Sequence, residues 1–158
     1  MRSLSPKEGC TFAELCGQPS QKRYVDAVRL FEKAFAADPR LAEAPRTAHR
    51  YNAACYAALA ARGEGVGAPT EPRKRAALRA KALAWLKVDL AFWNSQAGSK
   101  QAEDRQLAAS KLAHWLEADA LWETRPQAKR EGWTEQEPRA WDQLWSAVRQ
   151  TLAEARKP

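Results

Sequence analysis

This sequence of 158 residues has few of the residue types that support metal, redox or membrane chemistry. It contains only two histidines and three cysteines, and the cysteines Cys10, Cys16 and Cys55 show no C-x-x-C spacing. An odd number of cysteines without that spacing disfavours a disulfide framework and indicates a reducing compartment, so we expect a cytoplasmic protein. No apolar run reaches the roughly 18 residues of a membrane span, and the first residues lack the apolar core of a secretory signal. We therefore expect no membrane contact by this domain.

The sequence also lacks the alternation of apolar and polar residues that is typical of β-strands. Instead, almost every segment between Gly, Pro and Ser residues has helical spacing. The chain is 45% hydrophobic and 28% charged, which is typical of a globular protein. We predict an all-α fold for a single domain over residues 1–158, with about six helices in three antiparallel pairs.

Helix start and stop signals place the six predicted helices. Pro6 opens a short first helix, and the second runs from about Gln21 to Ala37. The third starts near Ala44 to Arg46 and ends at Gly63, and the fourth spans about Thr70 to Asn94. A fifth follows the Gln-Ala-Gly-Ser-Lys turn, and the sixth opens either at the T-x-x-E box of Thr134 and Glu137 or at Pro138. All seven tryptophans lie at or beyond Trp85, and we expect most of them in the core.

The stretch YVDAVRLFEKAFAADP, residues 24–39, has Ala27, Phe31, Ala34 and Pro39 at the spacing of a tetratricopeptide second helix. RYNAACYAALA then resembles the first helix of a following repeat, and KALAWLKVDLAFW resembles the next second helix. The resemblance implies a right-handed α-α superhelix with repeat one at about 6–39 and repeat two at about 44–97. Repeat two holds an inserted loop at 62–73, and a degenerate repeat or cap covers about 100–156.

The order of these segments, with FAELC before them and HW after them, resembles the tetratricopeptide region at the C-terminal end of many planctomycete-type bacterial serine/threonine protein kinases. The chain has no glycine-rich nucleotide loop, no H-R-D loop and no D-F-G motif, so kinase activity does not follow. The resemblance implies a non-catalytic interaction module that binds a protein or peptide and needs no cofactor.

In tetratricopeptide stacks the first helices line a concave groove that binds the peptide. The resemblance places six candidate groove residues here: Phe12, Cys16, Tyr51, Asn52, Cys55 and Leu59. Asn52 matches an asparagine that such proteins use to hold a peptide's terminal carboxylate, although Phe12 and Cys16 replace the expected polar partners. The alternative for Asn52 is a helix-surface amide that bonds to the neighbouring linker backbone.

His49 and Cys55 form the most reactive-looking pair, but their spacing argues against a joint site. Six residues separate them by roughly 120° around a helix, so they point to different faces. A zinc site assembled across helices from His49, Cys10, Cys16 and Cys55 stays an alternative, and a buried small thiol is the simpler interpretation of Cys55. No residues have the arrangement of a nucleophile, a base and an orienting carboxylate, so we predict no enzyme activity.

Five basic residues and no acidic one lie in a short run: Arg73, Lys74, Arg75, Arg79 and Lys81. Such runs usually form a solvated helix end. With a net charge of +7, they also indicate an alternative function, the binding of nucleic acid or of an acidic partner. A second alternative is a structural or dimerising cap formed by the tryptophan-rich C-terminal part, and the sequence leaves the oligomeric state open.

Overall fold

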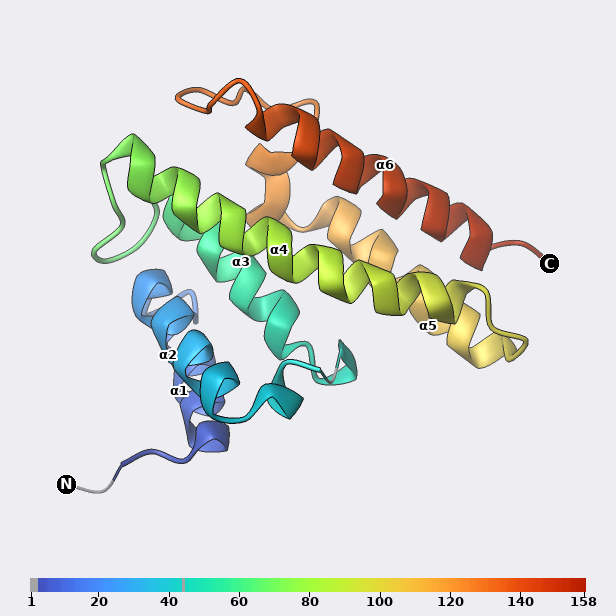
Figure 1. Cartoon of the computed structure of the whole chain (residues 1–158), viewed down its shortest axis with the longest axis horizontal. Helices are drawn as coiled ribbons and strands as arrows, with labels where there is room; N and C mark the ends of the chain where they lie inside the picture. The colour runs from blue at the N-terminus through green and yellow to red at the C-terminus, as the bar shows by residue number, and fades with distance from the viewer. Residues whose placement is uncertain (1–2, 44) are drawn as a thin grey trace. The chain divides into compact units, whose positions relative to one another are not determined.

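The computed structural model describes residues 3–43 and 45–158, and over these residues the chain forms helices and no strand (Figure 1). The predicted all-α class is confirmed. The α-helices are α1 (Pro6–Cys16), α2 (Tyr24–Ala37), α3 (His49–Ala61), α4 (Pro72–Ala97), α5 (Ala102–Glu117) and α6 (Glu137–Ala155). Three short 3₁₀ helices lie between them: η1 (Pro39–Leu41), η2 (Pro45–Thr47) and η3 (Asp119–Thr124).

The chain forms two compact units, Met1–Leu86 and Lys87–Pro158, whose boundary lies inside α4. The predicted repeat two, which starts at Ala44 outside the described residues, therefore contributes helical residues to both units. In the part of the chain that the structure describes, no helix is long and apolar enough to cross a bilayer.

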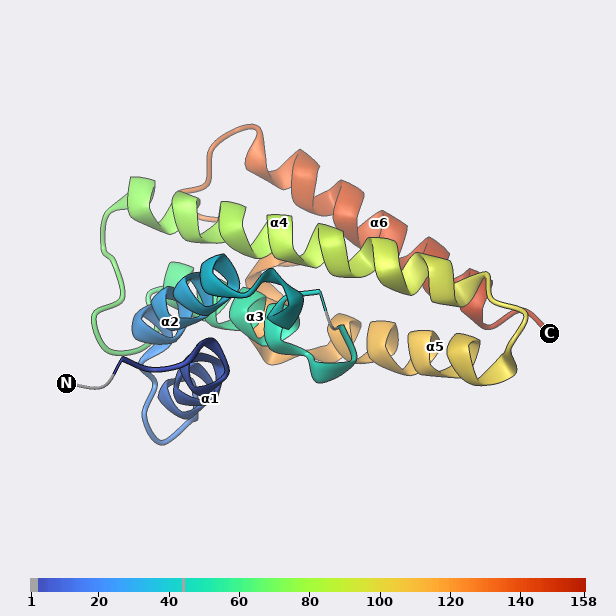
Figure 2. The ribbon, with the colours of Figure 1, turned by 60° about the horizontal axis from the view of Figure 1, so that its bottom comes forward.

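The first unit begins with α1, whose start is fixed by a complete capping box. The Ser5 side chain accepts a hydrogen bond from the Glu8 backbone N–H, the Glu8 carboxylate accepts one from the Ser5 N–H at 2.8 Å, and Pro6 occupies the first turn. At Gly9, α1 lies close to α2: a Cβ there would be in ordinary contact with Cβ of Ala34, at 3.5 Å. The two helices therefore pack tightly along their small residues (Figure 2).

The core of the first unit is built from small residues and one aromatic ring. Its buried members are Cys10, Ala13, Ala27, Phe31, Ala34 and Ala53. The apolar stripe of α2 is buried at Tyr24, Ala27, Val28, Phe31 and Ala34. Phe35 is partly exposed, and its ring meets Trp85 edge-on at 6.2 Å. Ala27, Phe31 and Ala34 thus occupy the interior positions that their spacing predicts.

The third helix starts later than predicted, at His49 rather than between Ala44 and Arg46. Pro45 begins the short η2 turn instead, and Ala48 adopts a left-handed backbone conformation with φ of 61°. A left-handed residue cannot continue a right-handed helix, so α3 begins directly after it. From there the alanines of α3 form a buried surface that comprises Ala53, Ala54, Ala57, Ala58, Ala60 and Ala61.

The inserted loop after α3 is held to the first unit at defined points. The Val66 N–H donates to the Lys22 carbonyl oxygen at 2.8 Å. Gly65 has φ of 89°, and a Cβ atom there would clash with the same Lys22 carbonyl. Arg75 donates from Nε to the Pro69 carbonyl at 2.7 Å and so ties the start of α4 to the loop. The insertion therefore has a specified conformation.

The second unit contains the end of α4 together with α5, η3 and α6. The apolar stripe of α6 is buried and comprises Trp141, Leu144, Trp145, Val148 and Leu152. Glu137 accepts a hydrogen bond from the Thr134 N–H at 2.8 Å, and Pro138 lies in the first turn of α6, so both predicted start signals contribute.

Arginine side chains hold η3 and the following segment against α6. Arg125 is buried and donates to the backbone carbonyls of Trp115 and Ala118, while its guanidinium lies 5.7 Å from the ring centre of Trp145. Trp145 Nε1 donates to the Thr124 carbonyl at 3.0 Å. These bonds satisfy carbonyls that the ends of α5 and η3 leave without helical partners.

Candidate functional site

The structure places the predicted groove residues of α3 in different environments. Tyr51, Asn52 and Leu59 are partly exposed. Cys55 is buried, with 8% of its surface exposed, and its place in a partner-binding groove stays a prediction.

Asn52 bonds to a carboxylate of its own chain rather than to the linker backbone. Its Nδ2 donates to Oε1 of Glu14 on α1 at 3.4 Å, and His49 Nδ1 lies 2.9 Å from the same oxygen. A site for a peptide's terminal carboxylate needs hydrogen-bond donors or cations, whereas Glu14 brings a negative charge to this position. The geometry therefore disfavours a carboxylate clamp.

Phe12 and Cys16 do not extend the α3 residues into one surface. The Glu14 side chain reaches α3. Phe12 precedes Glu14 by two residues, so the two side chains point in directions about 200° apart around the α1 axis. Phe12 is 47% exposed on the side away from Glu14, and Cys16 packs against the core of the first unit. Glu14 of α1 bonds to α3, and at Gly17, directly after α1, the ring of Tyr56 occupies the space that a Cβ would need.

The alternative zinc site lacks geometric support. Burial raises the pKa of Cys55 to about 12, and burial together with Glu14 raises the pKa of Cys10. Both thiols are therefore less acidic than an exposed thiol, which makes the loss of the proton on metal binding more costly. Over residues 3–43 and 45–158, no group of three or more His, Cys, Asp and Glu side chains lies close enough to hold a metal ion.

The basic run does not form one exposed surface. Arg79 is only 4% exposed, and Arg75 holds the inserted loop. Lys74 pairs with Glu71, and Lys81 pairs with Glu32, each at 2.7 Å, while Arg73 is exposed. Ion pairs between exposed side chains are weak, so nucleic-acid binding through this run stays an alternative.

The tryptophan-rich region is largely interior, as expected for a core. Four of its rings are buried, those of Trp93, Trp115, Trp141 and Trp145. Trp133 is partly exposed, lies 6.4 Å from Trp141 and is covered by Arg130. Trp122 is 49% exposed beside Arg125. Most of these aromatic side chains therefore stabilise the second unit and are not available to a ligand.

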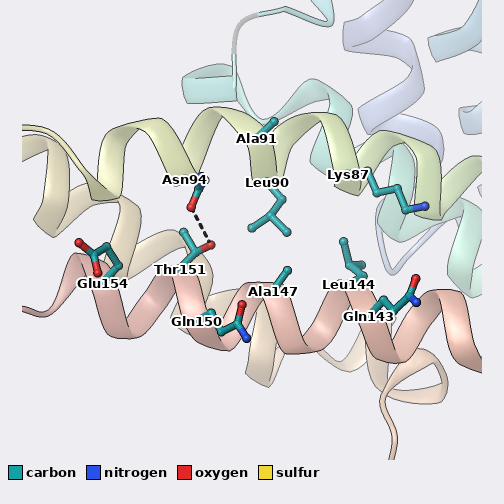
Figure 3. Close-up of a pocket in the computed structure, with 10 residues that line it drawn as sticks. All are labelled: Lys87, Leu90, Ala91, Asn94, Gln143, Leu144, Ala147, Gln150, Thr151 and Glu154. Atoms are coloured by element: carbon teal, nitrogen blue, oxygen red, sulfur yellow. Dashed lines mark hydrogen bonds between the residues drawn. The ribbon is translucent and has the colours of Figure 1, made fainter.

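The second unit contains an open groove between the end of α4 and α6, here called the α4–α6 groove (Figure 3). Its volume is about 660 Å³, and it is lined by Lys87, Leu90, Ala91, Asn94, Gln143, Leu144, Ala147, Gln150, Thr151 and Glu154. Leu90 points from α4 toward α6, and Leu144 and Ala147 point back toward α4. Leu90 and Leu144 are buried and form an apolar floor.

Polar side chains surround this floor in a definite order. Thr151 Oγ1 donates to Asn94 Oδ1 at 3.3 Å and joins the two helices. Lys87 lies at one end of the groove, and Glu154 lies at the other end, beyond the Asn94–Thr151 bond (Figure 3). Ala91 is exposed and lies at the α4 rim of the groove, where its methyl group points away from α6 (Figure 3). The groove therefore offers an apolar middle between ends of opposite charge.

The sequence predictions did not identify this groove. Gln143, Ala147, Gln150 and Glu154 fit the solvent-facing side of an amphipathic helix, which gives no sign of a neighbouring helix. One signal was present: Ala147 and Thr151 are small residues on the side of the helix that carries Leu144. Small residues at i and i+4 next to an apolar stripe leave room for a third element.

Comparisons with known proteins found no match: no family model, no curated protein and no solved structure is significantly similar to this chain.

Proposed function

We propose that this chain is a non-catalytic protein-binding module of tetratricopeptide-like helix pairs that binds a segment of a partner protein in the α4–α6 groove. One observation carries the proposal: the buried side chains of Leu90 and Leu144 form the floor of a groove that is open to solvent. Sites of several hundred Å³ with an apolar lining and a few polar groups are the usual form of binding sites.

The packing of the first unit supports the helical-repeat part of the proposal. Ala27 and Ala34 are buried where α1 and α2 approach each other, and Phe31 fills the space beside them. The resemblance to regions that follow bacterial kinase domains supports the same class of function, a scaffold that binds proteins. Tyr51 and Leu59 on α3 are the rival contact surface for such a scaffold, because both are partly exposed on one helix.

A displayed library of random 14-residue peptides, selected against the full chain, tests the proposal. The affinities of the enriched peptides are then measured for the unsubstituted chain and for Ala91→Trp, which places a large ring at the rim of the groove. Ala153→Trp is the matched control, because Ala153 is an exposed alanine of α6 outside the groove lining.

We expect Ala91→Trp to weaken binding at least about tenfold and Ala153→Trp to leave it unchanged. The absence of any enriched peptide would contradict the proposal. Binding that Leu59→Glu abolishes and Ala91→Trp leaves intact would move the function to α3.

A further inference from the structure

We propose that the occupant of the α4–α6 groove is an amphipathic α-helix of a partner protein with an acidic first turn and a basic last turn, bound parallel to α6. This inference rests on the proposed function and adds the conformation, charge order and direction of the bound segment.

The walls of the groove favour a helix over an extended peptide. Extended peptides are held mainly by main-chain hydrogen bonds to an exposed strand edge. Both walls here are α-helices, whose backbone groups bond within the helix along their length. The groove can therefore offer side-chain contacts, which an amphipathic helix meets with apolar residues at i, i+4 and i+7.

The dimensions of the groove also suit a helix. Its α6 wall runs from Gln143 to Glu154, which is about three turns or roughly 16 Å. Ala91 lies at the rim of the groove and Ala147 in its lining, where short side chains allow a second helix to come close. A helix of three to four turns would bury its apolar row over Leu90 and Leu144.

Shape argues against a second copy that pairs through the same surface. A two-fold symmetric contact brings the same patch of both copies together. Two grooves that face each other would enclose a void above Leu90 and Leu144, and such a void forfeits packing contacts. The groove therefore calls for a convex partner.

The charged ends determine which helix fits. Lys87 is exposed at one end and attracts an acidic side chain. Glu154 lies at the other end, close to the C-terminus of α6, whose dipole adds negative potential there. Glu154 is paired with Lys157 at 2.5 Å, but both side chains are solvent-exposed, so a basic side chain of the partner can replace Lys157 at little cost.

The direction in which the partner helix binds follows from that helix's own dipole. A helix is stabilised by acidic residues in its first turn and basic residues in its last turn. If it lies parallel to α6, its first turn meets Lys87 and its last turn meets Glu154. In the antiparallel direction, pairing with Lys87 and Glu154 would need acidic residues in the last turn and basic residues in the first turn. Charges in these positions destabilise a helix. The side-chain charges therefore favour the parallel arrangement, and the basic last turn of the bound helix offsets the like dipole ends that this arrangement brings together at the C-terminus of α6.

A second selection tests the inference. The displayed probe is a 14-residue alanine-based helix with leucine at i, i+4 and i+7, and with the first and last turns randomised over Asp, Glu, Lys, Arg and Ser. We expect enriched sequences to carry acidic first turns and basic last turns. We expect Lys87→Glu to weaken their binding about fivefold, because it turns an attraction at the groove rim into a repulsion. Arg149→Glu is the control, since this exposed residue of α6 lies outside the groove lining.

Each other outcome identifies what failed. One such outcome is that enriched peptides show no preference for acidic first turns and basic last turns while Ala91→Trp still abolishes their binding. This result would overturn the inference and leave the proposed function standing. The reverse charge order would overturn the direction. No enrichment in either selection would overturn both proposals. Self-association in sedimentation that Ala91→Trp abolishes would assign the groove to a second copy and overturn the inference.

Discussion

Thr151 of α6 donates its hydroxyl proton to the side-chain oxygen of Asn94 on α4, across 3.3 Å. Thr151 is buried in the same helix stripe as Leu144, so its position would suit an apolar residue. A hydroxyl at this position makes a bond between the two walls of the α4–α6 groove. The bond sets the spacing of the groove on the Glu154 side (Figure 3).

Thr151→Val tests the importance of this bond. Valine has the shape of threonine without the hydroxyl, so the substitution removes the hydrogen bond and little else. We expect a loss of about 1 kcal/mol in the free energy of unfolding, measured by urea denaturation. We also expect weaker peptide binding. Ser146→Ala, an exposed hydroxyl on α6 outside the groove lining, should change neither. An unchanged affinity in Thr151→Val would show that the bond does not shape the groove.

Gly17 is expected to be intolerant of even one added methyl group. A Cβ there would clash with the ring of Tyr56, which stacks on Tyr24 with a centroid distance of 5.8 Å. Gly17→Ala must push this ring away, and such overpacking costs about 1–3 kcal/mol. Gly98→Ala is the control, because its nearest neighbours lie 3.8 Å or more from the added carbon. Equal unfolding midpoints for the two variants would contradict the packing described for α1 and α3.

The three thiols should differ in reactivity. Cys10 and Cys55 are buried, and Cys16 is partly exposed. Because burial raises the pKa of Cys10 and Cys55, these two thiols have little thiolate to react with a disulfide reagent at pH 8. We expect one thiol to react rapidly in the folded chain and all three in denaturant. Rapid reaction of Cys55 in the folded chain would contradict its buried position.

The stability of the chain should fall as the solution becomes alkaline. Burial raises the pKa of Cys55 from its ordinary value of 9.0 to about 12, and it raises the pKa of Tyr56 from 10.0 to about 12. The unfolded chain therefore releases these protons first, and the free energy of unfolding declines from about pH 9 toward pH 12. Urea denaturation between pH 8 and pH 11 measures this slope. Cys55→Ala should make it shallower, and a stability that rises over this range would contradict the account.

Helix order and helix faces could be predicted from the sequence because each is a local property. Pro6, the Asp38-Pro39 stop and the spacing of Ala27, Phe31 and Ala34 determine α1 and α2 with little help from distant residues. The start of α3 was misplaced because the left-handed backbone of Ala48 has no counterpart in residue type. Alanine rarely adopts that conformation, so no sequence rule would place a helix start there.

The candidate site was harder to predict because it depends on which helices are neighbours. Asn52 was interpreted from its own helix, and its partner Glu14 lies 38 residues away. The α4–α6 groove likewise joins residues that are separated by more than fifty positions, such as Asn94 and Thr151. Helical periodicity describes one face of one helix, and it does not show that two faces leave a space between them.

The central claim is that a partner segment binds between α4 and α6. Methyl-labelled NMR spectra of the chain, recorded while a selected peptide is added, test it most directly. The account predicts shift changes at the methyl groups of Leu90, Ala91, Leu144 and Ala147, with Leu59 and Ala153 unaffected. Changes confined to Leu59 and the neighbouring alanines of α3, with the groove methyl groups unmoved, would contradict it.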